Sequence, residues 1–236
     1  DLMDIEFITV MDNMLKGGLE NGRYALFGDF DKQVLYNTID GEEDVWDILD
    51  ICGKRGSKPL VYTLPYNCRN PIKVQKELQK LFGAEGKPAP ALADMDGEVQ
   101  YHKCKDDDYE REKIQKVLDE LIDGEDRIDS KHIVVLAPHT LKNSVVSRVE
   151  RHKIVVFDPK TTYNPKEKAV EVSTIYRFKG FGRPVVLLTG ITEEEEDNLI
   201  YTGMSRAEYL LHVFYRKGSM IDKKRSGKED RESVHE

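Results

Sequence analysis

Cysteine is scarce in this chain, and its cysteines follow no recognisable pattern. There are three, Cys52, Cys68 and Cys104. An odd, scattered set has neither the even count of a disulfide framework nor the close spacing of a metal site. Free thiols of this kind are typical of the reducing cytosol. We therefore expect a cytoplasmic protein without a metal site, whose cysteines are small buried or half-buried side chains.

Long apolar runs are also missing. The longest, at 133–137 and 185–188, have the length of strands, whereas a membrane helix requires about 20 apolar residues. No charged-then-apolar leader segment opens the chain. We therefore expect no membrane partner.

The chain has no excess of positive charge. Its net charge is −8 at pH 7 and its pI is about 5.4, so no overall basic field attracts nucleic acid. Any nucleic-acid contact must be local, or must depend on a part of the protein outside this chain. The 236 residues, 39% hydrophobic and 34% charged, indicate a globular protein of one or two domains with a sizeable core.

Predicted strands and helices alternate through most of the chain. A helix is predicted over 71–82, with proline in its first turn, and another over 109–123, with one apolar face. The fully apolar strand at 133–137 is typical of a parallel sheet covered on both faces. Further strands are predicted at 60–64, 99–103, 154–157, 170–175, 185–189 and 211–215, and further helices at 140–151 and 198–207. This alternation predicts an α/β fold with a mostly parallel sheet flanked by helices.

The two ends of the chain differ from this pattern. Apolar residues at helical spacing predict an amphipathic helix over 5–15, followed by a strand at 23–27. The Gly- and Lys-rich stretch at 52–57 is the best linker candidate. Residues 217–236 are charged and have no apolar period, which predicts a flexible tail.

Four motifs carry candidate chemistry, and we expect them at the carboxyl ends of strands, where parallel sheets bind ligands. In the first, Gly28 and Asp29 close the strand at 23–27, and Gln33 follows in the loop. An amide there can hydrogen-bond both a phosphate oxygen and an attacking water. By itself, the motif equally fits an ordinary Gly-Asp turn with a surface glutamine.

In the second motif, Arg69 follows the strand at 60–64 and precedes the helix at 71–82. A cation near a helix N-terminus is unfavourable unless an anion is present, which favours a phosphate partner. A surface arginine paired with a carboxylate is the alternative.

The third motif follows the strand at 170–175. Thr174, Tyr176 and Arg177 are succeeded by Lys179 and Gly180. A hydroxyl, an aromatic ring and two cations suit the phosphates and bases of a single strand. The alternative is a Lys-Gly turn that ends a short helix.

In the fourth motif, Arg206 lies in the last turn of the helix predicted to begin near Asn198. A cation is favoured there on dipole grounds alone. The acidic run at 193–197 suits the start of this helix and is most simply a solvated loop.

Taken in order, the four motifs read strand-GDxxQ, L-x-x-N-x-R, T-x-x-x-x-K-G and Y-x-x-x-S-R-A. This series resembles motifs III to VI of superfamily 1 helicases of the UvrD/Rep type. The resemblance covers nearly the whole chain and implies a RecA-like fold. Residues 1–52 would be the C-terminal remnant of a first RecA-like domain, 57–216 the second domain, and 217–236 the charged flexible tail. We expect the chain to be an excised piece of a longer protein.

The resemblance also implies roles for individual residues. ATP would lie between the two RecA-like domains. Gln33 would sense the γ-phosphate and position water, and Arg69 and Arg206 would act as arginine fingers, which contribute on the order of 10³–10⁵ in rate. The remaining nucleotide-binding positions would be Gly28, Asp29, Lys179 and Gly180. The groove for single-stranded DNA (or RNA) would include Tyr36, Thr174, Tyr176 and Arg177.

Three departures from the family pattern matter. Tyr176 stands where the family usually has a DNA-contacting histidine, and Gly182 stands where it usually has a nucleotide-holding glutamate. No G-x-x-x-x-G-K-[ST] loop, which holds the β- and γ-phosphates and Mg²⁺, is present in the sequence.

We therefore expect ATP and Mg²⁺ to bind only in a full-length DNA-repair helicase with its N-terminal RecA-like domain, and this chain alone not to hydrolyse ATP. Two alternatives are a non-enzymatic RecA-like module that binds protein or nucleic acid, and a stand-alone α/β nucleotide-binding protein. The missing phosphate loop argues most strongly against the stand-alone protein.

Overall fold

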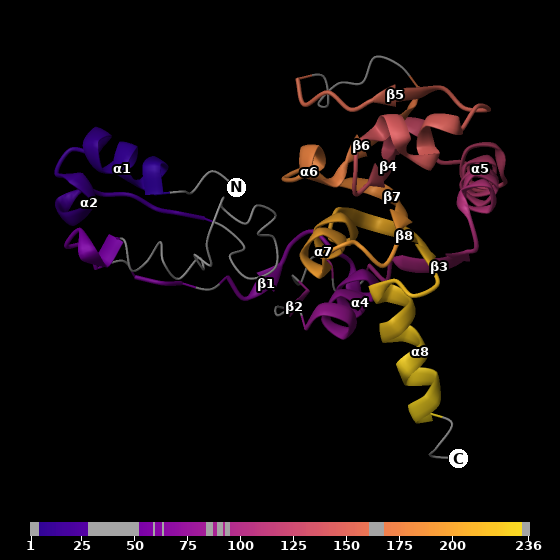
Figure 1. Cartoon of the computed structure of the whole chain (residues 1–236). Helices are drawn as coiled ribbons and strands as arrows, with labels where there is room; N and C mark the ends of the chain where they lie inside the picture. The colour runs from indigo at the N-terminus through magenta and orange to yellow at the C-terminus, as the bar shows by residue number, and fades with distance from the viewer. Residues whose placement is uncertain are drawn as a thin grey trace. The chain divides into compact units, whose positions relative to one another are not determined.

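The structure, a computed structural model, describes residues 5–27, 52–58, 60–62, 64–83, 87–88, 92, 95–160 and 168–232. The chain divides into two compact units, Asp1–Leu64 and Pro65–Glu236 (Figure 1). The predicted linker, 52–57, lies within the first of these units.

The smaller unit is built around two short helices, α1 (Ile5–Met14) and α2 (Gly18–Asn21). Ile8, Leu19 and Cys52 form its buried core. The predicted opening helix is therefore confirmed.

The strands predicted at 23–27 and 60–64 are wrong, because the described residues of both segments form no ladder hydrogen bonds. An extended segment becomes a strand only when a neighbour pairs with it, and the described part of this unit offers no such neighbour.

The larger unit contains a six-stranded sheet in which every pair of neighbours is parallel. The strand order is β3-β8-β7-β4-β6-β5. The strands are β3 (Glu98–Cys104), β4 (Ile133–Ala137), β5 (Ile154–Val156), β6 (Val170–Thr174), β7 (Arg183–Ile191) and β8 (Ala207–Arg216). A separate parallel pair joins β1 (Tyr66–Asn67) to β2 (Lys87–Pro88). The predicted α/β fold with a parallel sheet is confirmed.

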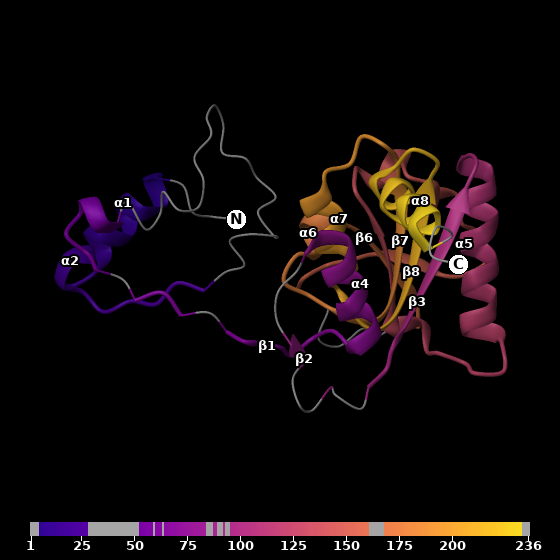
Figure 2. The same cartoon turned by 90° about the horizontal axis from the view of Figure 1, so that it is seen from below.

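Helices cover both faces of this sheet (Figure 2). On one face lie α5 (Asp107–Asp123) and the short 3₁₀ turn η4 (Val145–Arg148). On the other lie α4 (Ile72–Phe82), α6 (Ile175–Phe178) and α7 (Asp197–Met204). Every residue of β4 is buried, because successive side chains point to opposite faces and both faces are covered. This is the arrangement expected of a RecA-like domain.

Two local predictions are wrong in the larger unit. The helix predicted over 140–151 is instead two 3₁₀ turns, η3 (Leu141–Asn143) and η4. The hydroxyl of Ser144 accepts a hydrogen bond from the amide of Val146 at 3.3 Å, and such a local bond competes with a continuous helix. The segment expected to be a flexible tail instead contains helix α8 (Met220–Glu232), whose Ile221 is fully buried.

Candidate functional site

The first predicted motif cannot be placed. Gly28, Asp29, Gln33 and Tyr36 all lie outside the described residues. The other three motifs lie in the larger unit, and the structure gives the position of each.

Arg206 lies in the turn between α7 and β8, two residues beyond the end of the helix. Helix α7 follows β7 and returns the chain to the amino end of the next strand. We expected this motif at a carboxyl end, and that expectation is wrong. Two features of the sequence, a helix and then a strand, already imply this return, because a strand that follows a crossover helix in a parallel sheet begins at the amino edge.

The side chain of Arg206 faces inward and is only 1% exposed. Its Nε donates to the carbonyl of Thr202 at 2.9 Å, and its Nη2 donates to the hydroxyl of Ser205 at 2.8 Å. Nη1 donates to the carbonyl of Phe181 at 3.4 Å. A buried guanidinium requires such acceptors, because a charge without partners in the interior is very costly.

The loop of Arg69 meets this turn. Its next residue, Asn70, donates from Nδ2 to the carbonyls of Ser205 at 3.0 Å and Ala207 at 2.7 Å. Arg69 itself is half-buried, and its amide donates to Oδ1 of Asn67 at 2.9 Å. The second and fourth motifs, far apart in the sequence, therefore lie side by side.

Arg69 precedes helix α4, as predicted, but the start of this helix is occupied by protein groups. The amides of Ile72 and Lys73 donate to the carbonyls of Met95 and Asp96, at 3.1 and 2.9 Å. An anion is therefore not needed to satisfy these two amides, and the dipole argument for a phosphate beside Arg69 is weaker than the sequence indicated.

The turn after Lys179 and Gly180 reaches the same edge. Gly180 has a φ of 88°, a conformation that favours glycine. Beyond it, Phe181 accepts the bond from Arg206, and the amide of Arg183 donates to the carbonyl of Arg206 at 3.1 Å. We call the residues that meet here the amino-edge cluster: Arg69, Asn70, Phe181, Gly182 and Arg206.

Gly182 faces a carboxylate from the neighbouring strand. A Cβ at position 182 would collide with the side chain of Glu208. Gly182 stands where the helicase pattern has a glutamate, and the carboxylate of Glu208, from β8, lies beside it.

The remaining predicted residues lie elsewhere. Thr174 ends β6 at a carboxyl end, and its hydroxyl accepts a hydrogen bond from the amide of Arg177 at 3.2 Å, which caps α6. Tyr176 is 38% exposed and Arg177 is also exposed. Thr174 therefore lies at the opposite edge of the sheet from the amino-edge cluster, because all strands of the sheet run in one direction.

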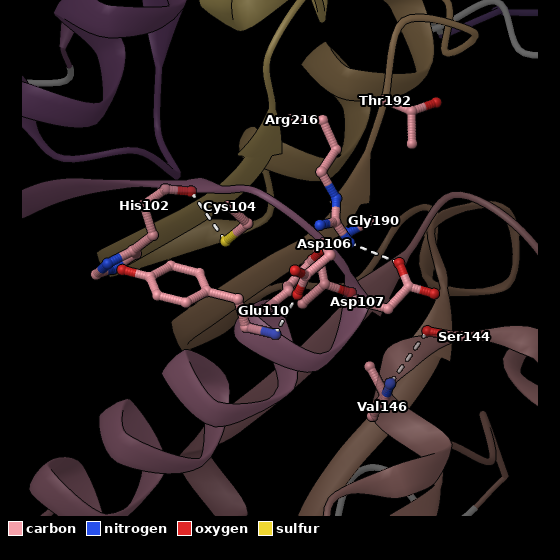
Figure 3. A network of polar contacts seen from close by, with 12 residues as sticks. His102, Cys104, Asp106, Asp107, Glu110, Ser144, Val146, Gly190, Thr192 and Arg216 are labelled. Atoms are coloured by element: carbon pink, nitrogen blue, oxygen red, sulfur yellow. Dashed lines mark hydrogen bonds and ion pairs between the residues drawn. The ribbon is translucent and has the colours of Figure 1, made fainter.

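A buried ionic network at the carboxyl ends of β7 and β8 was missed by sequence reasoning (Figure 3). Glu110 of α5 has no exposed surface. One of its oxygens accepts from the amide of Gly190 at 2.7 Å, and the other lies 2.8 Å from Nη2 of Arg216. Arg216 also donates to Asp107 at 2.6 Å. In the sequence Glu110 is one of several acidic residues opening a helix, and nothing distinguishes it from a solvated one.

The environment of Glu110 shifts its titration. Burial raises the pKa of its carboxyl, while the Gly190 amide and the Arg216 guanidinium act in the opposite direction. Because these groups bond to one another, the network anchors the start of α5 to the sheet.

A second missed pair lies between β3 and β8, on His102 and His212. The two rings stack with centroids 5.2 Å apart, and Nε2 of His102 lies 2.9 Å from Nδ1 of His212. Burial, and then the nearby His102, lowers the pKa of His212 to about 4. The pair is therefore held in its neutral form at pH 7.

One group in the described residues has metal-like geometry: Asp119, Asp123 and His152. Asp119 already accepts from His152 Nε2 and from Arg151 Nη1, both at 2.8 Å. The arginine supplies the positive charge that a metal ion would bring, so the arrangement is explained as an ion-pair network. A cavity of about 440 Å³ lies beside it and is lined by Ile122, Arg127, Ile128, Asp129, Ser130, His152, Lys153 and Lys168.

Comparison with known proteins gives likenesses among solved structures alone. No family model and no curated protein matches the chain. Among solved structures, the chain is similar to the C-terminal domain of a possible DNA helicase from Lactobacillus plantarum, with 14% sequence identity and a TM-score of 0.48. The likeness covers 65% of this chain and 89% of that chain. Of the helices in the described part of the protein, none is long and apolar enough to cross a membrane.

Proposed function

We propose that this chain is the C-terminal part of an ATP-dependent helicase of superfamily 1, and that its amino-edge cluster faces the nucleotide. The observation that carries the proposal is the meeting of three motifs at one edge. Asn70 bonds to both neighbours of Arg206, and Phe181 bonds to Arg206 itself. A polyphosphate requires several cations and amides in one place, and at this edge hydrogen bonds link the loop of Arg69 to the backbone on either side of Arg206.

In this proposal Arg206 and Arg69 are arginine fingers. The acceptors of Arg206 include two carbonyls and a hydroxyl, which are neutral groups. A phosphate oxygen is a stronger partner, because hydrogen bonds between two charged groups are roughly twice as strong as neutral ones. Arg206 would exchange its internal acceptors for the γ-phosphate when the nucleotide binds. ATP and Mg²⁺ would be held chiefly by the phosphate loop of the upstream RecA-like domain, and Gln33 would position water.

Single-stranded DNA, or RNA, would contact the carboxyl end of β6. Tyr176 and Arg177 are exposed on α6, where a ring can stack on a base and a guanidinium can pair with a phosphate. Because the chain has a net negative charge, this contact would depend on these local side chains and not on an overall basic surface.

The test is ATP hydrolysis stimulated by single-stranded DNA. This chain is compared with a chain extended upstream through a phosphate loop. We expect activity only in the extended protein, and a loss of about 10³-fold or more in kcat on Arg206→Ala. Arg206→Lys keeps the charge but not the forked donor geometry, so it should restore little activity. Arg148→Ala, at an exposed arginine of η4, is the matched control and should keep full activity.

Clear hydrolysis by this chain alone would overturn the proposal, and so would an extended protein that binds ATP but is indifferent to Arg206. Circular dichroism of each variant separates loss of activity from loss of fold.

A non-enzymatic RecA-like binding module is the second candidate. The observation in its favour is the burial of Arg206, whose three guanidinium nitrogens all donate to protein acceptors. If this arrangement persists in the extended protein with ATP present, the arginine is structural and the module is the better description.

A further inference from the structure

Asn70 is the most deeply embedded polar residue of the loop that carries Arg69. It is 2% exposed, and it lies 135 and 137 positions from the two residues whose carbonyls it contacts. A short polar side chain at such a site must find partners, because an unpaired buried amide is costly.

The side chain of Asn70 uses both kinds of hydrogen-bonding group. Nδ2 donates to the carbonyls of Ser205 and Ala207, the residues on either side of Arg206. Oδ1 accepts from Nδ2 of Asn67 at 2.9 Å. Asn67 in turn accepts, through Oδ1, the amides of Arg69 at 2.9 Å and of Asn70 at 3.0 Å. One continuous set of bonds thus joins the backbone of Arg69 to the backbone around Arg206.

The residue after Asn70 is fixed by packing. Pro71 is buried, and a Cβ at Gly97 would collide with its ring and lie 2.8 Å from the carbonyl of Tyr209. Gly97 has a φ of 65°, so position 97 favours glycine on both steric and conformational grounds. The loop is therefore held on the β8 side by its proline as well as by its asparagine.

We propose that Asn70 is a positioning residue that sets the spacing between Arg69 and Arg206, so that both arginines act on one phosphate group together. The inference rests on the proposed function of the two arginines. Asparagine is the residue type suited to the position. Aspartate would present a carboxylate to two carbonyl oxygens, and alanine would leave both carbonyls without this donor.

The first test uses this chain and needs no catalysis. Hydrogen exchange of the Arg206 Nε–H and of the Arg69 backbone N–H is measured by NMR in the wild type and in Asn70→Ala. We expect exchange to accelerate about tenfold or more at both sites, which corresponds to about 1.4 kcal/mol. The matched control is Thr189→Val, which removes another buried hydrogen bond to a carbonyl, that of Leu136 at 3.3 Å.

In the control variant, the hydrogen-exchange rates of the Arg206 Nε–H and the Arg69 N–H, relative to those of the other sheet amides, should be the same as in the wild type. Unchanged exchange at both sites in Asn70→Ala overturns the positioning role.

The second test uses the extended, active protein. A displaced catalytic group costs up to about 10²-fold in rate, so Asn70→Ala should lower kcat by about 10- to 100-fold with little change in KM for ATP. In an Arg206→Ala background, Asn70→Ala should cause no further loss of kcat, because the spacing between Arg69 and Arg206 no longer matters once one of the two arginines is gone. A merely structural residue would lower activity equally in both backgrounds, and that result overturns the inference.

The two tests separate the inference from the proposal beneath it. An extended wild type without ATPase activity overturns the proposed function, and with it the catalytic meaning of Asn70. An active wild type in which Asn70→Ala keeps full kcat overturns the inference alone.

Discussion

At the scale of single residues, the structure changes the meaning of Arg206 most. Its predicted place in the last turn of a helix made a cation favourable on dipole grounds. In the structure its side chain is buried, and every guanidinium nitrogen has an acceptor within the fold. An arginine with satisfied donors is a stable part of a core. Any role with a phosphate therefore requires an exchange of partners, which the comparison of Arg206→Ala with Arg206→Lys addresses.

The pair of His102 and His212 predicts a pH dependence of stability. An unfolded histidine has a pKa of about 6.5, whereas that of His212 in the folded chain is about 4. Between these values the unfolded chain binds a proton that the folded chain does not, so folding becomes less favourable as pH falls through this window. The charged groups facing His102 are Lys113, which lowers its pKa further, and Glu120, which raises it.

We expect the free energy of unfolding, measured with urea, to fall between pH 7 and pH 5. The variant His212→Leu should show a shallower fall than the wild type, since it removes the most strongly shifted of the two groups. Equal slopes for variant and wild type would contradict this account.

At the scale of elements, helix α5 shows how local sequence and tertiary contacts act together. Its N-cap residue, Asp106, accepts a hydrogen bond from the amide of Tyr109 at 2.8 Å. Acidic residues in the first turn suit the positive end of the helix dipole. One of them, Glu110, turns inward to Gly190 and Arg216 instead of toward solvent. The start of the helix is therefore set by the Asp106 cap and the acidic first turn, and its position on the sheet is fixed by the contacts of Glu110.

Replacing the cap should weaken the fold in a graded way. We expect Asp106→Ala to lower the free energy of unfolding by about 1 kcal/mol, because one amide of the first turn loses its acceptor. Asp106→Ser and Asp106→Asn keep an acceptor and should retain most of the stability. Urea unfolding at pH 7 measures all four proteins, and an alanine variant as stable as the serine variant would show that the cap contributes nothing.

At the scale of the whole molecule, the larger unit is completed by α8, a helix that the sequence did not indicate. Ile221 is fully buried, and Lys224 donates to the carbonyl of Leu81 at 2.6 Å and pairs with Asp197 at 2.7 Å. The guanidinium of Arg225 lies 3.9 Å from the ring centre of Tyr101. The segment is charged, and the apolar Ile221 in the first turn of its helix anchors it.

Removal of residues 217–236 tests this anchoring. We expect truncation after Arg216 to lower the free energy of unfolding by about 2 kcal/mol, mainly from loss of the buried Ile221 side chain. The ion pair of Lys224 is partly exposed and should contribute little. The variant Ile221→Ala should reproduce most of the effect, and a truncated chain with unchanged stability would restore the view of this segment as a flexible tail.

The sequence predicted the regular elements of the larger unit well, because their signals are local. The run of five apolar residues in β4 required cover on both sides, and the spacing of Ile114, Val117 and Leu118 gave α5 its buried face. Predictions failed where an element depends on a neighbour. Residues 23–27 have the composition of a strand, yet the described residues of their unit supply no partner. The segment 140–151 forms two short turns in place of one helix, and the hydroxyl of Ser144 bonds to the amide of Val146 between them.

By itself, the sequence determined the α/β class, the parallel sheet and the motif residues, since the hydrophobic period and the residue types can be read directly from the sequence. Only the tertiary structure decided that Arg69, Phe181 and Arg206 share an edge, that Glu110 is buried and that Asn70 joins two distant segments. The reason is physical. Asn70 binds backbone carbonyls, which every residue possesses, so no residue type in the sequence marks its partners. Such contacts exist only after the strands have taken their order in the sheet.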